Sequence, residues 1–169
     1  MLKKLLTMVV LVFCTACSQS SGPTQVGPNR TVTIGPDQTA QSLVDTAGYS
    51  WSTSGDLDVS TITAPLIKRT ETMVLVVFNR SISSQNAIEE MKSRHLHPAN
   101  VYECLAFGAT IADVRSKYSI ACLGQYLQGG DSGEALYIES DDSDLNWGLV
   151  TADWGKDWYG NMRFLAVRD

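Results

Sequence analysis

The residues best suited to chemistry in this sequence lie in an acidic loop of the C-terminal third. Asp142, Asp144 and Asn146 alternate along the chain, as the first oxygen ligands of a calcium-binding loop do. Trp147 stands where such a loop needs a glycine, and the strand-like residues after it would carry Asp153 away from the last ligand position. We therefore expect a solvated acidic turn here, with Ca²⁺ binding as the alternative.

Aromatic residues cluster just after this loop. Their rings can stack on a sugar or a peptide, while neighbouring carboxylates and amides orient its polar groups. Trp147, the first of them, begins a strand pattern and is expected in the core. For the later rings the sequence leaves two interpretations open, a binding platform or core packing beneath a loop. The residues of the platform would be Trp154, Trp158, Tyr159, Asp153, Asp157 and Asn161.

An enzyme is the alternative class of function, and its residues would be Asp131, Ser132 and a histidine. The segment 129–133, GGDSG, superficially resembles the nucleophile motif of chymotrypsin-like proteases. The chain has no all-β pattern and no histidine in the required upstream context, so we expect a turn at this position. His95 and His97 have no carboxylate or cysteine at ligand spacing, and we expect neither to hold a metal or to act as a base.

Residues 1–16 have the pattern of a secretory signal, with two lysines followed by an apolar run too short to cross a bilayer. Two small residues stand directly before Cys17, which resembles the lipobox of bacterial lipoproteins, where this cysteine is acylated and becomes the new N-terminus. Cys14 replaces the usual leucine, and an ordinary signal peptide is the alternative. Residues 17–30 are rich in Ser, Gly, Pro and Gln, which favours a flexible tether. Ser18 fits transfer to an outer membrane, where the organism has one.

Charge and cysteine content limit the possible partners. The formal net charge is −5, and removal of the signal would take two lysines with it, which argues against nucleic acid and anionic lipid surfaces as partners. Once Cys14 is removed and Cys17 is acylated, Cys104 and Cys122 remain. Two thiols in an exported domain can form a disulfide, but both also lie among apolar residues, where free cysteine is common. The sequence leaves this choice open.

The elements that must hold these residues form a single domain, predicted over residues 31–169. The apolar run 73–78 predicts a central strand covered on both faces. Residues 84–108 predict two short helices, and several strand patterns follow them. This order predicts an α+β domain with mostly antiparallel pairing.

The helix pair has clear boundary signals. Pro98 keeps the preceding residue out of the helical region, so one continuous helix is not expected. Asn100 and Glu103 have the spacing of a capping box at the start of the second helix, and Gly108 is expected as its left-handed stop.

The order of these elements resembles the C-type-lectin-like fold, especially the bacterial branch that contains formylglycine-generating enzymes. The motifs that carry the resemblance are Leu96-x-Pro98-Ala99-x-x-x-Glu103 at the bend and Arg163-Phe164-Leu165-Ala166-Val167 in the closing strand. It implies a helix pair packed on a small, mostly antiparallel sheet, with a binding surface in the late loops. The calcium and sugar signature of true lectins and the C-terminal copper cysteines of the enzymes are missing, so no activity follows from the fold.

A second resemblance, to a family of small bacterial proteins, spans nearly the whole mature chain and implies no activity. Its motifs include Gly48-Tyr49-x-Trp51, Val77-Phe78-Asn79-Arg80 and Glu103-x-Leu105-Ala106-Phe107-Gly108-Ala109.

Together these patterns predict a lipid-anchored, exported domain that binds a carbohydrate or a protein through its C-terminal loops, without catalysis. The alternatives are an exported enzyme on the same scaffold and a surface-display protein that has no small-molecule ligand.

Overall fold

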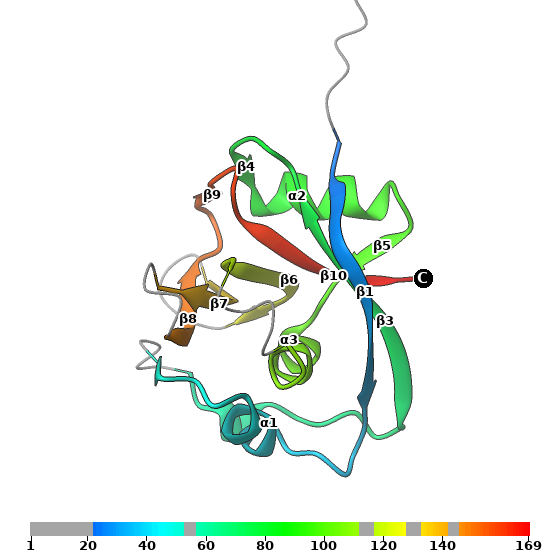
Figure 1. The fold of residues 1–169 in the computed structure, drawn as a ribbon, viewed down its shortest axis with the longest axis vertical. Coiled ribbons are helices and arrows are strands. Elements are labelled where there is room, and N and C mark those ends of the chain that lie inside the picture. Colours follow the sequence, from blue (N-terminus) through cyan, green and yellow to red (C-terminus); the bar gives the residue numbers. More distant parts are fainter. Residues whose placement is uncertain (1–21, 53–56, 112–116, 128–132, 142–145) are drawn as a thin grey trace, which may run out of the picture.

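The computed structural model describes residues 22–52, 57–111, 117–127, 133–141 and 146–169. Among these residues no helix has both the length and the apolar character to cross a membrane. The elements, in chain order, are β1 (Thr24–Ile34), α1 (Ala40–Ala47), β2 (Trp51–Ser52), the 3-10 turn η1 (Val59–Thr61), β3 (Arg69–Val77), β4 (Ile82–Ser83), α2 (Ser84–Lys92), β5 (Leu96–Pro98), α3 (Val101–Gly108), β6 (Ile120–Leu127), β7 (Glu134–Ser140), β8 (Trp147–Asp153), β9 (Asp157–Trp158) and β10 (Arg163–Arg168) (Figure 1).

Most strands belong to one eight-stranded sheet in the order β1-β3-β10-β6-β7-β8-β2, with β5 paired to β10 off this path. Neighbouring strands run antiparallel, except that β10 runs parallel to β6 and β2 runs parallel to β8. Strands β4 and β9 form a separate pair. The prediction of an α+β domain with a mostly antiparallel sheet is therefore confirmed.

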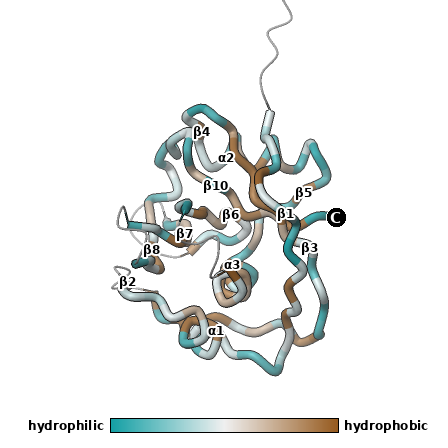
Figure 2. Tube along the Cα trace, viewed as in Figure 1, coloured by the Kyte–Doolittle hydropathy of each residue, from teal (hydrophilic) through white to brown (hydrophobic). Residues whose placement is uncertain are grey.

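Strand β3 separates two hydrophobic cores. Met73 and Leu75 face the core that contains residues of α1 and α3, whereas Val74 and Val76 face the core that contains residues of α2. Figure 1 shows α2 on one side of β3 and β10 and the other helices on the opposite side, and Figure 2 shows hydrophobic stretches along the interior strands. The predicted central strand, covered on both faces, is confirmed.

The helix pair forms as its boundary signals predict. Ser83 caps α2, and its side chain accepts a hydrogen bond from Asn86 N. At the start of α3, Asn100 Oδ1 accepts from Glu103 N at 2.9 Å, while Glu103 Oε2 accepts from Asn100 N at 2.8 Å. Pro98 lies in β5, between the two helices. The capping box and the break in the helix are therefore both confirmed.

The expected left-handed stop at Gly108 is wrong. Gly108 is the last residue of α3, and Ala109 after it keeps a helical conformation, with φ −67° and ψ −14°. A Cβ atom on Gly108 would lie 2.2 Å from Tyr49 Oη. This glycine therefore permits close packing of α3 against the segment that follows α1, and it does not turn the chain.

A disulfide joins α3 to the sheet. It links Cys104 in α3 to Cys122 in β6, with the Cα atoms 6.1 Å apart, and both side chains are fully buried. Of the two possibilities that the sequence leaves open, a bridge or two free core thiols, the structure has the bridge.

The folded domain begins earlier than the sequence predicts. Strand β1 starts at Thr24, within the range 17–30 that we expect to be a tether, and it pairs with β3 over most of its length. The register of this pairing shifts between Val26 and Arg30, where β1 bulges. The Gly and Pro residues of this segment lead to the prediction of a linker, because β-bulges and flexible linkers favour the same residues.

Candidate functional site

Trp158 lies in the core and not on a binding platform. Its side chain is 1% exposed, and its indole Nε1 donates to Ser84 Oγ at 2.8 Å. Tyr137 and Phe164 pack edge-on against the ring. Lys156 Nζ lies 4.4 Å from the ring centroid, and burial lowers the pKa of this lysine. This corrects the expectation of a ligand contact, because a buried indole whose N–H has a partner is a core residue.

The other residues of the expected platform lie along the connection from β8 to β10. Tyr159 is 77% exposed, and Asp153 Oδ1 accepts a hydrogen bond at 2.7 Å from a backbone N–H of the following turn. Asp157 lies in β9, which pairs with β4. The groove described in the next paragraph is lined by Trp154, and not by Tyr159, Asp153, Asp157 or Asn161.

This groove, of about 590 Å³, opens between α2, β5, the start of α3, β6 and the turn after β8. We call it the α2–β6 groove. Its volume is in the range typical of small-molecule sites. Tyr126 and Trp154 stand edge-on in it, with ring centroids 5.4 Å apart. Its lining residues are Arg69, Ile88, Lys92, His97, Pro98, Asn100, Glu103, Leu123, Gly124, Tyr126 and Trp154.

Hydrogen bonds to distant elements hold the backbone of Trp154. Its N–H donates to Gly133 O at 3.0 Å, and its carbonyl accepts from Ser84 Oγ at 2.7 Å. Gly133 has φ +70°, and a Cβ atom there would lie 1.9 Å from the Tyr126 ring. A glycine at this position therefore lets Tyr126 pack across the backbone. Tyr126 is 51% exposed and Trp154 is half-buried, so both rings are positioned by the fold and still reach solvent.

Charged side chains line the other part of the α2–β6 groove. Arg69 Nη2 donates to Glu103 Oε1 at 2.9 Å, so this arginine serves the fold. His97 Nδ1 lies 2.8 Å from Asp169 Oδ1. Lys92 is exposed at the end of α2, and no salt bridge among the described residues involves it. Lys92 is therefore the cation of the groove most accessible to a ligand.

This arrangement can bind a ring and an anion together. Tyr126 and Trp154 offer aromatic surface to an apolar face of a ligand, and Lys92 can donate charge-assisted hydrogen bonds to a carboxylate. The amphipathic rings suit a sugar, which has both apolar C–H faces and hydroxyl groups.

The sequence did not point to Tyr126 or Lys92 as site residues. Tyr126 follows a buried strand pattern and offers no signal beyond an aromatic residue near a glycine-rich segment. Lys92 lies on the polar face of a helix, where a solvated lysine is the ordinary expectation. Neither signal could have placed these residues in one groove with Trp154, because their proximity depends on how the sheet brings β6 beside α2.

The remaining predicted sites lie mostly outside the described residues. Asn146 is described, and its Nδ2 donates to Asp141 Oδ2 at 3.0 Å. Within the described ranges, no group of three or more His, Cys, Asp or Glu side chains could hold a metal ion. The predicted residues that lie outside these ranges are Cys17, Asp131, Ser132, Asp142 and Asp144.

Comparison of the chain with protein-family models, with curated proteins and with solved structures finds no match. The function of the α2–β6 groove is therefore argued from its own residues.

Proposed function

We propose that this chain is an exported, lipid-anchored binding protein without catalytic activity. Its anchor is Cys17, and its domain binds an extracytoplasmic carbohydrate that carries a carboxylate. The ligand occupies the α2–β6 groove, with a sugar ring against Tyr126 and Trp154 and the carboxylate near Lys92. Where the organism has an outer membrane, the anchor lies there.

The observation that carries this proposal is the aromatic pair in the groove. Tyr126 and Trp154 come from different elements, and their ring centroids lie 5.4 Å apart at partly exposed positions. Gly133 holds this geometry through contacts to both residues, and Ser84 Oγ donates to the carbonyl of Trp154. Partly exposed aromatic rings that the fold has already positioned bind a ligand at a lower cost in conformational entropy.

The order of the elements supports a C-type-lectin-like fold as the scaffold. Strand β3 is followed by the helices α2 and α3, by the meander β6, β7 and β8, and by β10, which pairs antiparallel with β3. In that fold the late loops make the binding surface, and Trp154 lies in the late connection after β8.

Isothermal titration of the exported domain tests the site, with a hexuronate oligosaccharide as the acidic ligand and a chitooligosaccharide as the neutral one. We expect the acidic sugar to bind more tightly. Trp154→Ala should weaken that binding by roughly fivefold or more, because aromatic anchors commonly contribute 1 kcal/mol or more. Lys92→Gln should remove the preference for the acidic sugar.

Tyr159→Ala is the matched control, because Tyr159 is an exposed aromatic residue of the same connection that does not line the groove. It should leave binding unchanged. Equal losses for Trp154→Ala and Tyr159→Ala would reject the groove as the site. If the domain binds an acidic peptide and neither sugar, the ligand of the groove is a protein and not a carbohydrate.

The anchor has its own test. The chain expressed with its signal should partition into the detergent phase, and Cys17→Ala should move it to the aqueous phase. Detergent partitioning that survives Cys17→Ala would reject lipidation at this residue.

A further inference from the structure

A second feature lies on the β1 side of the molecule, where β1 bulges away from β3. Val26 pairs with Leu75 and Arg30 pairs with Met73, so three residues of β1 lie opposite one residue of β3. Gly27 within the bulge has φ +74°, a conformation that side-chain-bearing residues rarely adopt. Bulges of this kind re-aim side chains and are common beside functional sites.

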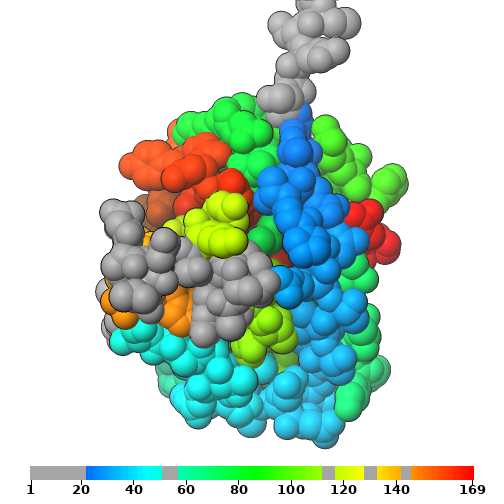
Figure 3. Space-filling view, viewed as in Figure 1, coloured from blue at the N-terminus to red at the C-terminus, as the bar shows by residue number. Residues whose placement is uncertain are grey.

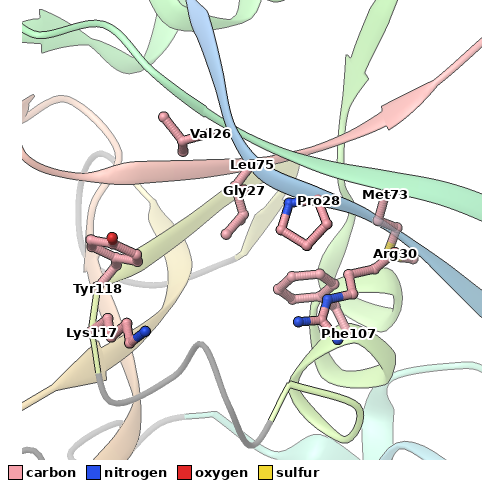
Figure 4. A pocket seen from close by; sticks show the side chains of 9 residues that line it. All are labelled: Val26, Gly27, Pro28, Arg30, Met73, Leu75, Phe107, Lys117 and Tyr118. Atoms are coloured by element: carbon pink, nitrogen blue, oxygen red, sulfur yellow. The ribbon is translucent and has the colours of Figure 1, made fainter.

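A cavity of about 230 Å³ lies beneath this bulge (Figure 4). We call it the bulge cavity. Met73, Leu75 and Phe107 line it with apolar surface and are themselves buried, while Tyr118 stands on the far side from Phe107. Figure 3 shows β1 (blue) beside the yellow-green segment that begins at residue 117, on one face of the molecule.

Two cations line this mainly apolar cavity. Arg30 approaches from β1 and Lys117 from the opposite side, and Figure 4 shows their nitrogen atoms turned toward the space between them. Near an apolar wall, a cation attracts an anion more strongly than it does in water.

We propose that the bulge cavity binds a small aromatic carboxylate. Its ring lies among Met73, Leu75 and Phe107, and its carboxylate pairs with Lys117. The size fits, because an apolar cavity of about 150 Å³ holds benzene, and 230 Å³ leaves room for a short carboxylate arm. This site is separate from the α2–β6 groove and does not depend on the function proposed for that groove.

The test uses phenylacetate as the probe and the methionine methyl groups as reporters in a ¹H–¹³C spectrum of the whole chain. Met73 lines the bulge cavity, whereas Met91 and Met162 pack in the other core. We expect a saturable shift of the Met73 signal and constant Met91 and Met162 signals. Phenethylamine, which has the same ring with a positive charge, should give no saturable shift.

Lys117→Gln tests the charge pairing, and it should fold because Lys117 is exposed. We expect phenylacetate to bind roughly tenfold more weakly to this variant, the effect of one lost charge-assisted hydrogen bond, and Lys117→Arg to restore affinity. Lys68→Gln, the same change at an exposed lysine outside the cavity lining, is the control and should have no effect. A Met73 signal that never shifts, or one that shifts equally with phenethylamine, would overturn the proposal.

Discussion

Glu103 is an acid that the fold buries almost completely, at 2% exposure. Its two carboxylate oxygens have separate partners, since Oε2 accepts from Asn100 N and Oε1 accepts from Arg69 Nη2. The sequence predicts the first contact, because a capping box joins residues three apart. It could not predict the second, because Arg69 lies in β3 and meets α3 only in the folded chain.

Glu103→Gln should therefore lower the free energy of unfolding by roughly 1–3 kcal/mol, since it weakens hydrogen bonds of a buried charged group. Urea denaturation measures this change. Glu71→Gln removes the charge of the other carboxylate that pairs with Arg69. The side chain of Glu71 is more exposed than that of Glu103, so this change should lower the free energy of unfolding by about 0–1 kcal/mol. A loss for Glu103→Gln no larger than that for Glu71→Gln would contradict the role assigned to the buried acid.

Asp58 gives the clearest expected dependence on pH. Hydrogen bonds from the Ser60 side chain and then from its backbone lower the pKa of Asp58 below its ordinary 3.8. Because the folded pKa is the lower one, the ionised cap stabilises η1 above the unfolded pKa, and this stabilisation is lost as the pH falls through the folded pKa. Ser60→Ala should raise the Asp58 pKa toward 3.8, measured by NMR titration of its carboxyl carbon. An unchanged pKa would contradict the assigned cause.

The tryptophans show where inference from single residues stops. Trp147 is buried as predicted, with its Nε1 donating to Gly48 O at 3.0 Å. Trp158 is buried too, and its partner Ser84 is far away in sequence. A buried indole needs an acceptor for its N–H, and the sequence does not show which tryptophan will find one. For Trp154 and Trp158, core and surface positions could therefore not be told apart without the fold.

Among the elements, α3 is bound to the sheet by the disulfide between Cys104 and Cys122. The two cysteines are 18 residues apart, and closing a loop of this length in the unfolded chain stabilises the folded state by about 3 kcal/mol. The reduced protein should unfold at correspondingly lower urea concentration than the oxidised protein. Equal midpoints, or two titratable thiols before reduction, would contradict the bridge.

Strand β1 belongs to the folded domain from Thr24 onward, and truncation tests this boundary. Removal of residues 1–30 should lower the free energy of unfolding by roughly 2–4 kcal/mol more than removal of residues 1–21 does, because strand pairing and the apolar contacts of Val26 are lost. Equal stability of the two truncated proteins would contradict this boundary and support the predicted tether over residues 17–30.

The elements that the sequence predicts well are those with local signals. The central strand β3 has a continuous apolar run, and α2 and α3 have caps within their own first turn. Strand β1 lacks such a signal, because what orders it is its pairing with β3. The bulge cavity could not be predicted for the same reason, because no single strand forms it.

At the scale of the whole molecule, β10 joins strands from both sides of α3 in the chain. It pairs with β3 and β5, which precede α3, and with β6, which follows it. This arrangement brings α2, β5 and β6 next to one another (Figure 1). The α2–β6 groove is lined by residues of all three elements. The site thus depends on the topology of the entire domain, which explains why no single stretch of sequence pointed to it.

The most direct test of the central claim is the indole ¹H–¹⁵N spectrum of the folded domain during titration with a hexuronate oligosaccharide. Trp154 lies in the α2–β6 groove, whereas the indoles of Trp147 and Trp158 are buried and hydrogen-bonded, so one spectrum contains both the reporter and its references. We predict a saturable shift of the Trp154 signal while the Trp147 and Trp158 signals stay in place. A spectrum in which the Trp154 signal does not move as the sugar binds would contradict the groove as the binding site.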